Sequence, residues 1–166
     1  VGAKWSTQIA ARLRDCSLQF DKFPVRVDRV SGLVRWDGET ATFEDLRGFH
    51  ADAQITGHGS YRRGPGPGKL DLTLHATAAP LNLELQKALP VRLQEAWDEF
   101  RPSGRIDVQS RISWVPGEAV NVTLPKVLLK QGEVSLRSFP YPWYDVTGEF
   151  RFADDMLTVL SLSAEH

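Results

Sequence analysis

One stretch of this chain occurs twice. Residues 23–50 read FPVRVDRVSGLVRWDGETATFEDLRGFH, and residues 139–166 read FPYPWYDVTGEFRFADDMLTVLSLSAEH, which aligns with the first copy without a gap at an offset of 116 residues. Random pairing would give about two identical pairs in such a window. Eight are found: Phe23/Phe139, Pro24/Pro140, Val30/Val146, Gly32/Gly148, Arg35/Arg151, Thr42/Thr158, Leu46/Leu162 and His50/His166. The repeat predicts a repetitive architecture, and we expect this chain to be an excerpt of a longer repeat protein.

Most of the chain alternates between apolar and polar residues, as in the run of Leu70, Leu72 and Leu74. This period is typical of a strand with one dry face and one wet face. Turn residues separate the runs, so about ten or eleven short strands are expected. The predicted fold is mainly β, in a single domain over residues 1–166: an extended, twisted antiparallel meander curled into a groove.

Two segments have helical rather than alternating spacing. Residues 81–100 predict a helical insert, in which Pro90 is placed to open a second helix. Trp5, Ile9 and Leu13 lie four residues apart and predict a short N-terminal helix. Only the insert of residues 81–100 could cover such a sheet, and it is too short to cover all of it.

The composition excludes several classes of function. Twenty basic and twenty-one acidic side chains leave a net charge of −1, which gives no reason to expect nucleic-acid binding. A single cysteine, Cys16, excludes an intrachain disulfide. No run reaches the roughly 18 apolar residues that a membrane span needs. The start of the chain lacks the pattern of a signal peptide, so we expect any segment for export or anchoring to lie outside this excerpt.

Nothing in the sequence indicates catalysis, a cofactor or a metal. His50, His58 and His75 are not spaced as converging metal ligands. The carboxylates Glu95, Asp98 and Glu99 fall on one predicted helix, and the pair Asp154-Asp155 falls at a predicted turn, whereas glycoside hydrolysis needs two carboxylates facing each other across a cleft. Cys16 has no nearby histidine to activate it. We therefore predict a protein that is not an enzyme.

Two further segments have structural interpretations. The Gly-Pro tract of residues 64–68 lacks the Lys-Ser/Thr ending of a phosphate loop and is interpreted as a solvated loop, locally basic because of Arg62, Arg63 and Lys69. The aromatic residues 139–144 are interpreted as packing at the entry of a strand, because the first copy of the repeat has Val25 and Val27 at equivalent positions.

The apolar sides of the predicted strands have two interpretations. They form the closed core of a sandwich or barrel, or they line an open groove for lipid acyl chains. Periodicity alone favours the closed core, and the repeat favours the groove. The candidate lipid-facing residues are Phe49, Ala51, Ala53, Ile55, Leu70, Leu72, Leu74, Ile106, Val108, Ile112, Trp114, Val120, Val122 and Leu124.

The order of motifs resembles the AsmA-like proteins of the bacterial cell envelope, a family that includes the TamB-like proteins. The resemblance rests on Val30-Ser31-Gly32, on Gly57-His58-Gly59, on the connector of residues 80–89 and on the run of residues 97–107. It implies a long twisted sheet that is anchored to the inner membrane, projects through the periplasm, and carries phospholipid acyl chains in an apolar groove.

The leading hypothesis is a non-enzymatic segment of such an envelope protein, which offers an apolar β-groove for lipid transport or outer-membrane biogenesis. Its expected partners are phospholipid or another acyl-chain lipid, a membrane reached through segments outside this chain, and another copy of the chain through edge-to-edge association. The alternative is an extracellular β-sandwich that binds a polysaccharide or a protein partner through Trp36, Trp114 and Trp143.

Overall fold

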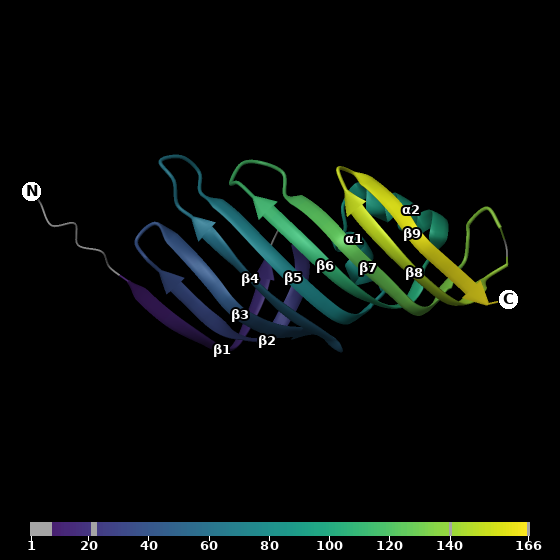
Figure 1. Cartoon of the computed structure of the whole chain (residues 1–166), viewed down its shortest axis with the longest axis horizontal. Coiled ribbons are helices and arrows are strands. Elements are labelled where there is room, and N and C mark those ends of the chain that lie inside the picture. Colours follow the sequence, from purple (N-terminus) through teal and green to yellow (C-terminus); the bar gives the residue numbers. More distant parts are fainter. Residues whose placement is uncertain (1–7, 21–22, 140, 166) are drawn as a thin grey trace, which may run out of the picture.

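The computed structural model describes residues 8–20, 23–139 and 141–165, which form one open antiparallel sheet with two short helices. Each strand pairs with its neighbours in sequence, so the spatial order of the nine strands is their order in the chain (Figure 1). The strands are β1 Ile9–Phe20, β2 Phe23–Trp36, β3 Thr40–His50, β4 Ala53–Arg62, β5 Lys69–Pro80, β6 Ser103–Trp114, β7 Asn121–Val134, β8 Trp143–Ala153 and β9 Met156–Glu165. The expected antiparallel meander is confirmed, and the two-sheet sandwich is not the fold found.

The predicted N-terminal helix is wrong over the residues that the structure describes. Residues 9–13 belong to β1, where Ile9 pairs with Trp36 and Leu13 pairs with Gly32. Trp5 lies outside the described residues. Apolar residues four apart also lie on one face of a strand, and pairing with β2 overrides the weak helical spacing.

The alternating run of Phe49, Ala51, Ala53 and Ile55 looks like one strand, but it is divided between two. β3 ends at His50, residues 51 and 52 form a turn in which Ala51 has a φ of 49°, and β4 begins at Ala53. His50 pairs directly with Ala53, so apolar residues on the two strands keep the same alternation through the turn. The described residues form nine strands rather than the ten or eleven short ones expected, and some strands are long, such as β2 with 14 residues.

The predicted helical insert is confirmed as α1 Leu83–Ala88 and α2 Val91–Phe100. The Asn82 side chain caps α1 by accepting a hydrogen bond of 2.9 Å from the backbone N–H of Leu85. Such a bond satisfies one of the helix's unpaired N-terminal donors. The C-cap residue that follows α2, Arg101, is in the left-handed conformation. The helices lie behind the C-terminal strands in Figure 1, and the backbone N–H of Ser135 donates to the carbonyl of Phe100.

The two copies of the repeat form equivalent hairpins, β2–β3 and β8–β9. The equivalence also includes the preceding strand, because β7 pairs with β8 in the same register as β1 pairs with β2. The corresponding pairs are Ala11/Val34 and Val127/Phe150, Leu13/Gly32 and Leu129/Gly148, Cys16/Val30 and Gly132/Val146, and Leu18/Val27 and Val134/Trp143. Each partner is displaced by 116 residues. The repeating unit is therefore three strands with a shared register, although its first strands share little sequence.

Left-handed residues recur at the same offset. Asp15 and Gln131 have φ values of 53° and 50°, and Arg29 and Asp145 have values of 53° and 46°. All four lie at shifts in strand register. Bulges of this kind bend a strand and increase its twist. The same bend is therefore built into β1–β2 and into β7–β8.

The bend of the first unit brings the start of β2 into contact with α1. The start of β2 lies behind β4 and β5 in Figure 1. His50, at the end of β3, contacts both β2 and α1. Its Nδ1 atom lies 2.8 Å from the carbonyl oxygen of Arg26 on β2, and its Nε2 atom lies 3.6 Å from the carboxylate of Glu84 on α1. Val25, Val30 and Ala53 are buried at this end of the sheet.

Candidate functional site

Directly paired residues of antiparallel strands project to the same side, so the register assigns each side chain to a face. One row across the middle strands consists of Phe43, Gly59, Leu72, Ile112 and Val122. A neighbouring row consists of Trp36, Ala41, Tyr61, Leu70 and Trp114. We call this side the apolar face.

Glycines allow large side chains to lie flat on the apolar face. A Cβ atom on Gly59 would lie 2.6 Å from Cδ2 of Leu72, and a Cβ atom on Gly57 would lie 2.5 Å from Cδ2 of Leu74. Each leucine therefore covers the glycine opposite it on the neighbouring strand. The result is a smooth, closely packed apolar surface. Most residues of its middle strands are half-buried without a second sheet above them, whereas Ile112 is buried.

The helices and the bent hairpin cover only parts of this face. Under the C-terminal strands, Leu129, Val134 and Val146 form a small core with Leu81 and Trp143 packed against it. At the other end, the start of β2 contacts α1. No second sheet lies over the apolar face in the part of the chain that the structure describes.

Within the sheet, most of the exposed large apolar side chains lie on the outermost strands, β1 and β9. On β9, Leu157, Val159 and Leu162 are 37%, 51% and 47% exposed, and on β1 Ile9 is 54% exposed. Single exposed apolar residues are ordinary, whereas these three residues of β9 lie in a row on one face of the strand.

The sequence placed most of the candidate lipid-facing residues on the side where the structure has them. Those on the apolar face are Ala53, Ile55, Leu70, Leu72, Leu74, Ile106, Val108, Ile112, Trp114, Val122 and Leu124. Val120 lies in the link before β7. Their contact with a lipid stays a prediction.

The expectation that Phe49 and Ala51 share this face is wrong. Phe49 pairs with Gln54, next to Ile55 in sequence, and so projects to the opposite side of the sheet. There the guanidinium of Arg29 lies 4.2 Å from the centre of the Phe49 ring. Ala51 is exposed in the turn. Both errors follow from the two-residue turn after His50, which the alternating pattern does not reveal.

Sequence reasoning also missed residues of the apolar face, although a signal was present. Phe43, Phe150 and Phe152 continue its rows. Two of them, Phe150 and Phe152, follow from the repeat, since their counterparts Val34 and Trp36 lie on the same face of β2.

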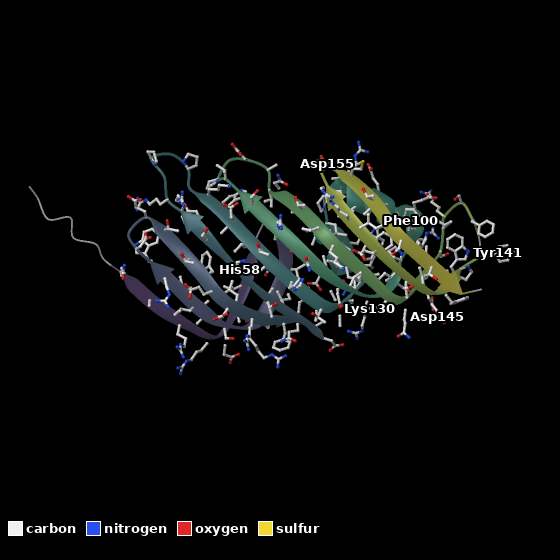
Figure 2. All side chains as sticks on the ribbon, in the orientation of Figure 1. His58, Phe100, Lys130, Tyr141, Asp145 and Asp155 are labelled. Carbon is white, nitrogen blue, oxygen red and sulfur yellow. The ribbon has the colours of Figure 1, made fainter. Side chains whose placement is uncertain are left out.

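The opposite face is polar and contains two adjoining hollows, which the sequence did not predict. Their volumes are about 640 and 460 Å³, and both are lined by His58, Thr73 and Arg111. His58 is labelled in Figure 2. His75 lines the second hollow, whereas His50 contacts β2 and α1. No group of three or more potential metal ligands occurs among the described residues.

An ion-pair network orders one end of the polar face. Lys130 donates to the carboxylate of Asp107, which also accepts a hydrogen bond of 2.9 Å from the backbone N–H of Ala78. These two donors lower the pKa of Asp107, with the Lys130 bond as the larger cause. Arg105 bonds the carbonyl of Ala78 and the carboxylate of Asp52. Ala78 has a φ of 57°, so the network fixes a bulge just before the helices.

The carboxylates of the helical insert have separate partners. Glu95 pairs with Arg92, Asp98 accepts from the side chain of Gln86, and Glu99 accepts from the hydroxyl of Ser138. Asp154 and Asp155 form the two-residue turn of the β8–β9 hairpin, with φ values of 51° and 56°. Positive φ at both positions is typical of a type I′ turn, and the turn interpretation of this pair is confirmed.

Two aromatic residues just before β8, Phe139 and Tyr141, lie at the surface. Their ring centres are 5.4 Å apart in a tilted arrangement. Trp143 packs against the small core under the C-terminal strands. Trp36 and Trp114 lie on the apolar face, in the row described above.

Comparison with known proteins yields no match to a family model, a curated protein or a solved structure. Among the described residues, neither helix has the length and apolar character needed to cross a membrane.

Proposed function

We propose that this chain is a non-enzymatic segment that shelters the acyl chains of a lipid on its apolar face. The observation that carries the proposal is the continuous apolar surface of an open sheet, without a second layer over its middle strands. Hydrocarbon chains need a continuous dry surface, and the flat packing of Leu72 and Leu74 over glycines supplies a smooth one.

The mechanism is passive. Each methylene group removed from water contributes about 0.8 kcal/mol, so several methylenes along the sheet bind without any charged contact. The row that contains Trp114 runs from β2 to β6, and the row that contains Ile112 runs from β3 to β7. An acyl chain lying along either row meets apolar residues on most of the strands that it crosses. No titrating group is required on this face.

The resemblance of the sequence to AsmA-like proteins supports a cellular location for this lipid binding. On this proposal the full-length protein lies in the periplasm or cell envelope and is anchored to the inner membrane. The segment then forms part of a route by which phospholipid reaches the outer membrane. An apolar face on a repeating three-strand unit suits such a role, because repetition extends a surface without changing its chemistry.

Mass spectrometry of organic extracts tests the proposal. Protein purified from a Gram-negative host is expected to release phospholipid or fatty acid. The delipidated protein is then expected to bind a fluorescent long-chain fatty acid. Absence of extracted lipid together with no saturable fatty-acid binding would overturn the proposal, and affinity for a glycan instead would favour a polysaccharide-binding role.

Two adjacent residues of β5 provide a matched pair of variants. Leu72 lies on the apolar face and Thr73 on the polar face. Leu72→Asn is expected to weaken fatty-acid binding about tenfold, which corresponds to about 1.4 kcal/mol, whereas Thr73→Asn changes it less than about twofold. Leu70→Asn serves as a second apolar-face variant if Leu72→Asn does not fold. Equal affinity in all variants with native circular dichroism would place the ligand elsewhere.

A further inference from the structure

Over residues 156–164 the outer edge of β9 lacks the charges and prolines that protect exposed strand edges, although the β8–β9 pair has a bulge at Leu160. β1, at the other edge, carries Arg12, Arg14 and Asp15, and it has a bulge after Leu13. Unprotected edges pair readily with other strands, and native proteins normally blunt them with charges, prolines or bulges. β9 is therefore the edge suited to receive another strand.

The repeat identifies the chemistry of that strand. β9 is the counterpart of β3, and β3 pairs on its far side with β4. In the β3–β4 pair, Gly59 lies opposite Phe43 and Gly57 lies opposite Leu46. The larger residues thus face glycines across the strand boundary, and Leu72 and Leu74 cover those glycines from the next strand.

The corresponding positions on β9 are Val159 and Leu162, which are about half exposed. Their counterparts Phe43 and Leu46 are half-buried beside β4 and β5. The first-copy hairpin and the second-copy hairpin have the same register at Trp36/Ala41 and Phe152/Leu157. Val159 and Leu162 are therefore more exposed than Phe43 and Leu46 because β9 has no neighbouring strand equivalent to β4 among the described residues.

We propose that the outer edge of β9 binds an extended peptide strand with the pattern of β4, in antiparallel orientation. The strand places a glycine opposite Val159 and a second glycine, two residues earlier, opposite Leu162. The backbone ladder provides affinity, and small residues opposite Val159 and Leu162 keep the pairing that β4 has beside β3. One local difference lies within β9: Leu160 is the extra residue in the β8–β9 pair, whereas the shift in the β2–β3 pair lies about Asp45 and Leu46.

A peptide with the sequence of β4, AQITGHGSYR, tests this proposal against the whole chain of residues 1–166. Titration followed by backbone amide NMR is expected to shift the signals of β9. A nitroxide on the N-terminal end of the peptide is expected to broaden amides near Ser163, and one on its C-terminal end to broaden those near Leu157. This polarity is the one that β4 has beside β3.

Matched variants distinguish the two sheet edges. Val159→Lys is expected to weaken peptide binding at least about tenfold, because it adds a charge to the edge and removes the contact with the peptide glycine. Ile9→Lys, at a similarly exposed residue of β1, is expected to change binding less than about twofold.

Several outcomes would overturn the proposal. These are the absence of shifts at millimolar peptide, shifts confined to β1, and shifts of β3 that show exchange with the native β4. Self-association of the protein that Val159→Lys abolishes, without peptide binding, would identify a second copy as the occupant instead. The lipid assays use the apolar face and need no added strand, so failure of one proposal leaves the other standing.

Discussion

Replacement of Gly59 by alanine tests the close packing on which the apolar face depends. The added Cβ atom would lie 2.3 Å from the carbonyl oxygen of Asp71 and 2.6 Å from Cδ2 of Leu72. Leu72 has a flexible side-chain end and can rotate away, but the carbonyl oxygen belongs to the backbone of β5. Accommodation therefore requires β5 to move, which disturbs its pairing with β4 and β6.

The expected cost follows from two opposing terms. Overpacking with backbone displacement costs about 1–3 kcal/mol, and the lower chain entropy of alanine in the unfolded state offsets about 0.5–1 kcal/mol of it. The net loss in the free energy of unfolding of Gly59→Ala is then about 1–2 kcal/mol. For a chain of this size that lowers Tm by about 2–8 °C, measured by circular dichroism during thermal unfolding.

Gly66→Ala is the matched control. Gly66 lies in the loop between β4 and β5, and an added Cβ atom there meets no atom within 4 Å. Its free energy of unfolding is expected to stay within about 0.5 kcal/mol of wild type or to rise slightly. Equal stability of the two variants would refute the close approach of β4 and β5, and with it the flat packing of Leu72.

Two further predictions concern the ion-pair network and the repeated bend. The pKa of Asp107 lies below its ordinary value of 3.8, because Lys130 and a backbone N–H bond its carboxylate. Its contribution to stability is present above that value and is lost as the pH falls through the lower folded pKa. Asp107→Ala should therefore lose about 1 kcal/mol in urea unfolding at neutral pH, with a difference from wild type that shrinks in acid; a difference independent of pH would contradict this. Asp145→Val should lose about 1–2 kcal/mol, because a β-branched residue is strained at a φ of 46°. Thr147→Val, two residues further along β8, should change stability by less than about 0.5 kcal/mol, and equal losses would argue against strain at Asp145.

The architecture could be predicted from the sequence because both the alternation of the strands and the repeat are visible in the order of apolar and polar residues. Leu70, Leu72 and Leu74 lie on one face as predicted, and β2–β3 and β8–β9 are equivalent hairpins. Long-range order was simple to predict here, since each strand pairs with its neighbour in sequence. The helical insert was found because its spacing and Pro90 differ from the rest of the chain.

The bends were missed, although a signal for them exists. A bulge adds one residue and so reverses which alternate positions are apolar. In β2 the apolar residues change from Val25 and Val27 to Val30 at the left-handed Arg29. The corresponding change in β8 lies between Trp143 and Val146. A change in which alternate positions are apolar, within one run, therefore indicates the position of a bulge from the sequence alone.

The errors at Phe49 and Ala51 and the polar hollows have different causes. A two-residue turn between directly paired residues leaves the alternation unbroken, so Phe49 and Ile55 look as though they share a strand. The hollows depend on how the sheet curves across β3 to β7, and no residue pattern encodes that curvature directly. The pattern of apolar and polar residues therefore predicts which face of the sheet a side chain lies on more readily than it predicts how the sheet curves.

Both proposals depend on the same property, an antiparallel sheet that ends without closing. Closure would bury the side chains of Val159 and Leu162 and would also pair the backbone of β9, whereas here both remain available. The two kinds of binding are physically distinct. A strand at the β9 edge binds through backbone hydrogen bonds, whereas a lipid on the apolar face binds by removing its hydrocarbon from water. Lengthening the sheet by one strand beyond β9 satisfies the first and enlarges the second, because each added strand brings alternate side chains to the apolar face. We therefore expect the strand peptide to increase the affinity for fatty acid, and a decrease would show that strand and lipid compete for the same surface.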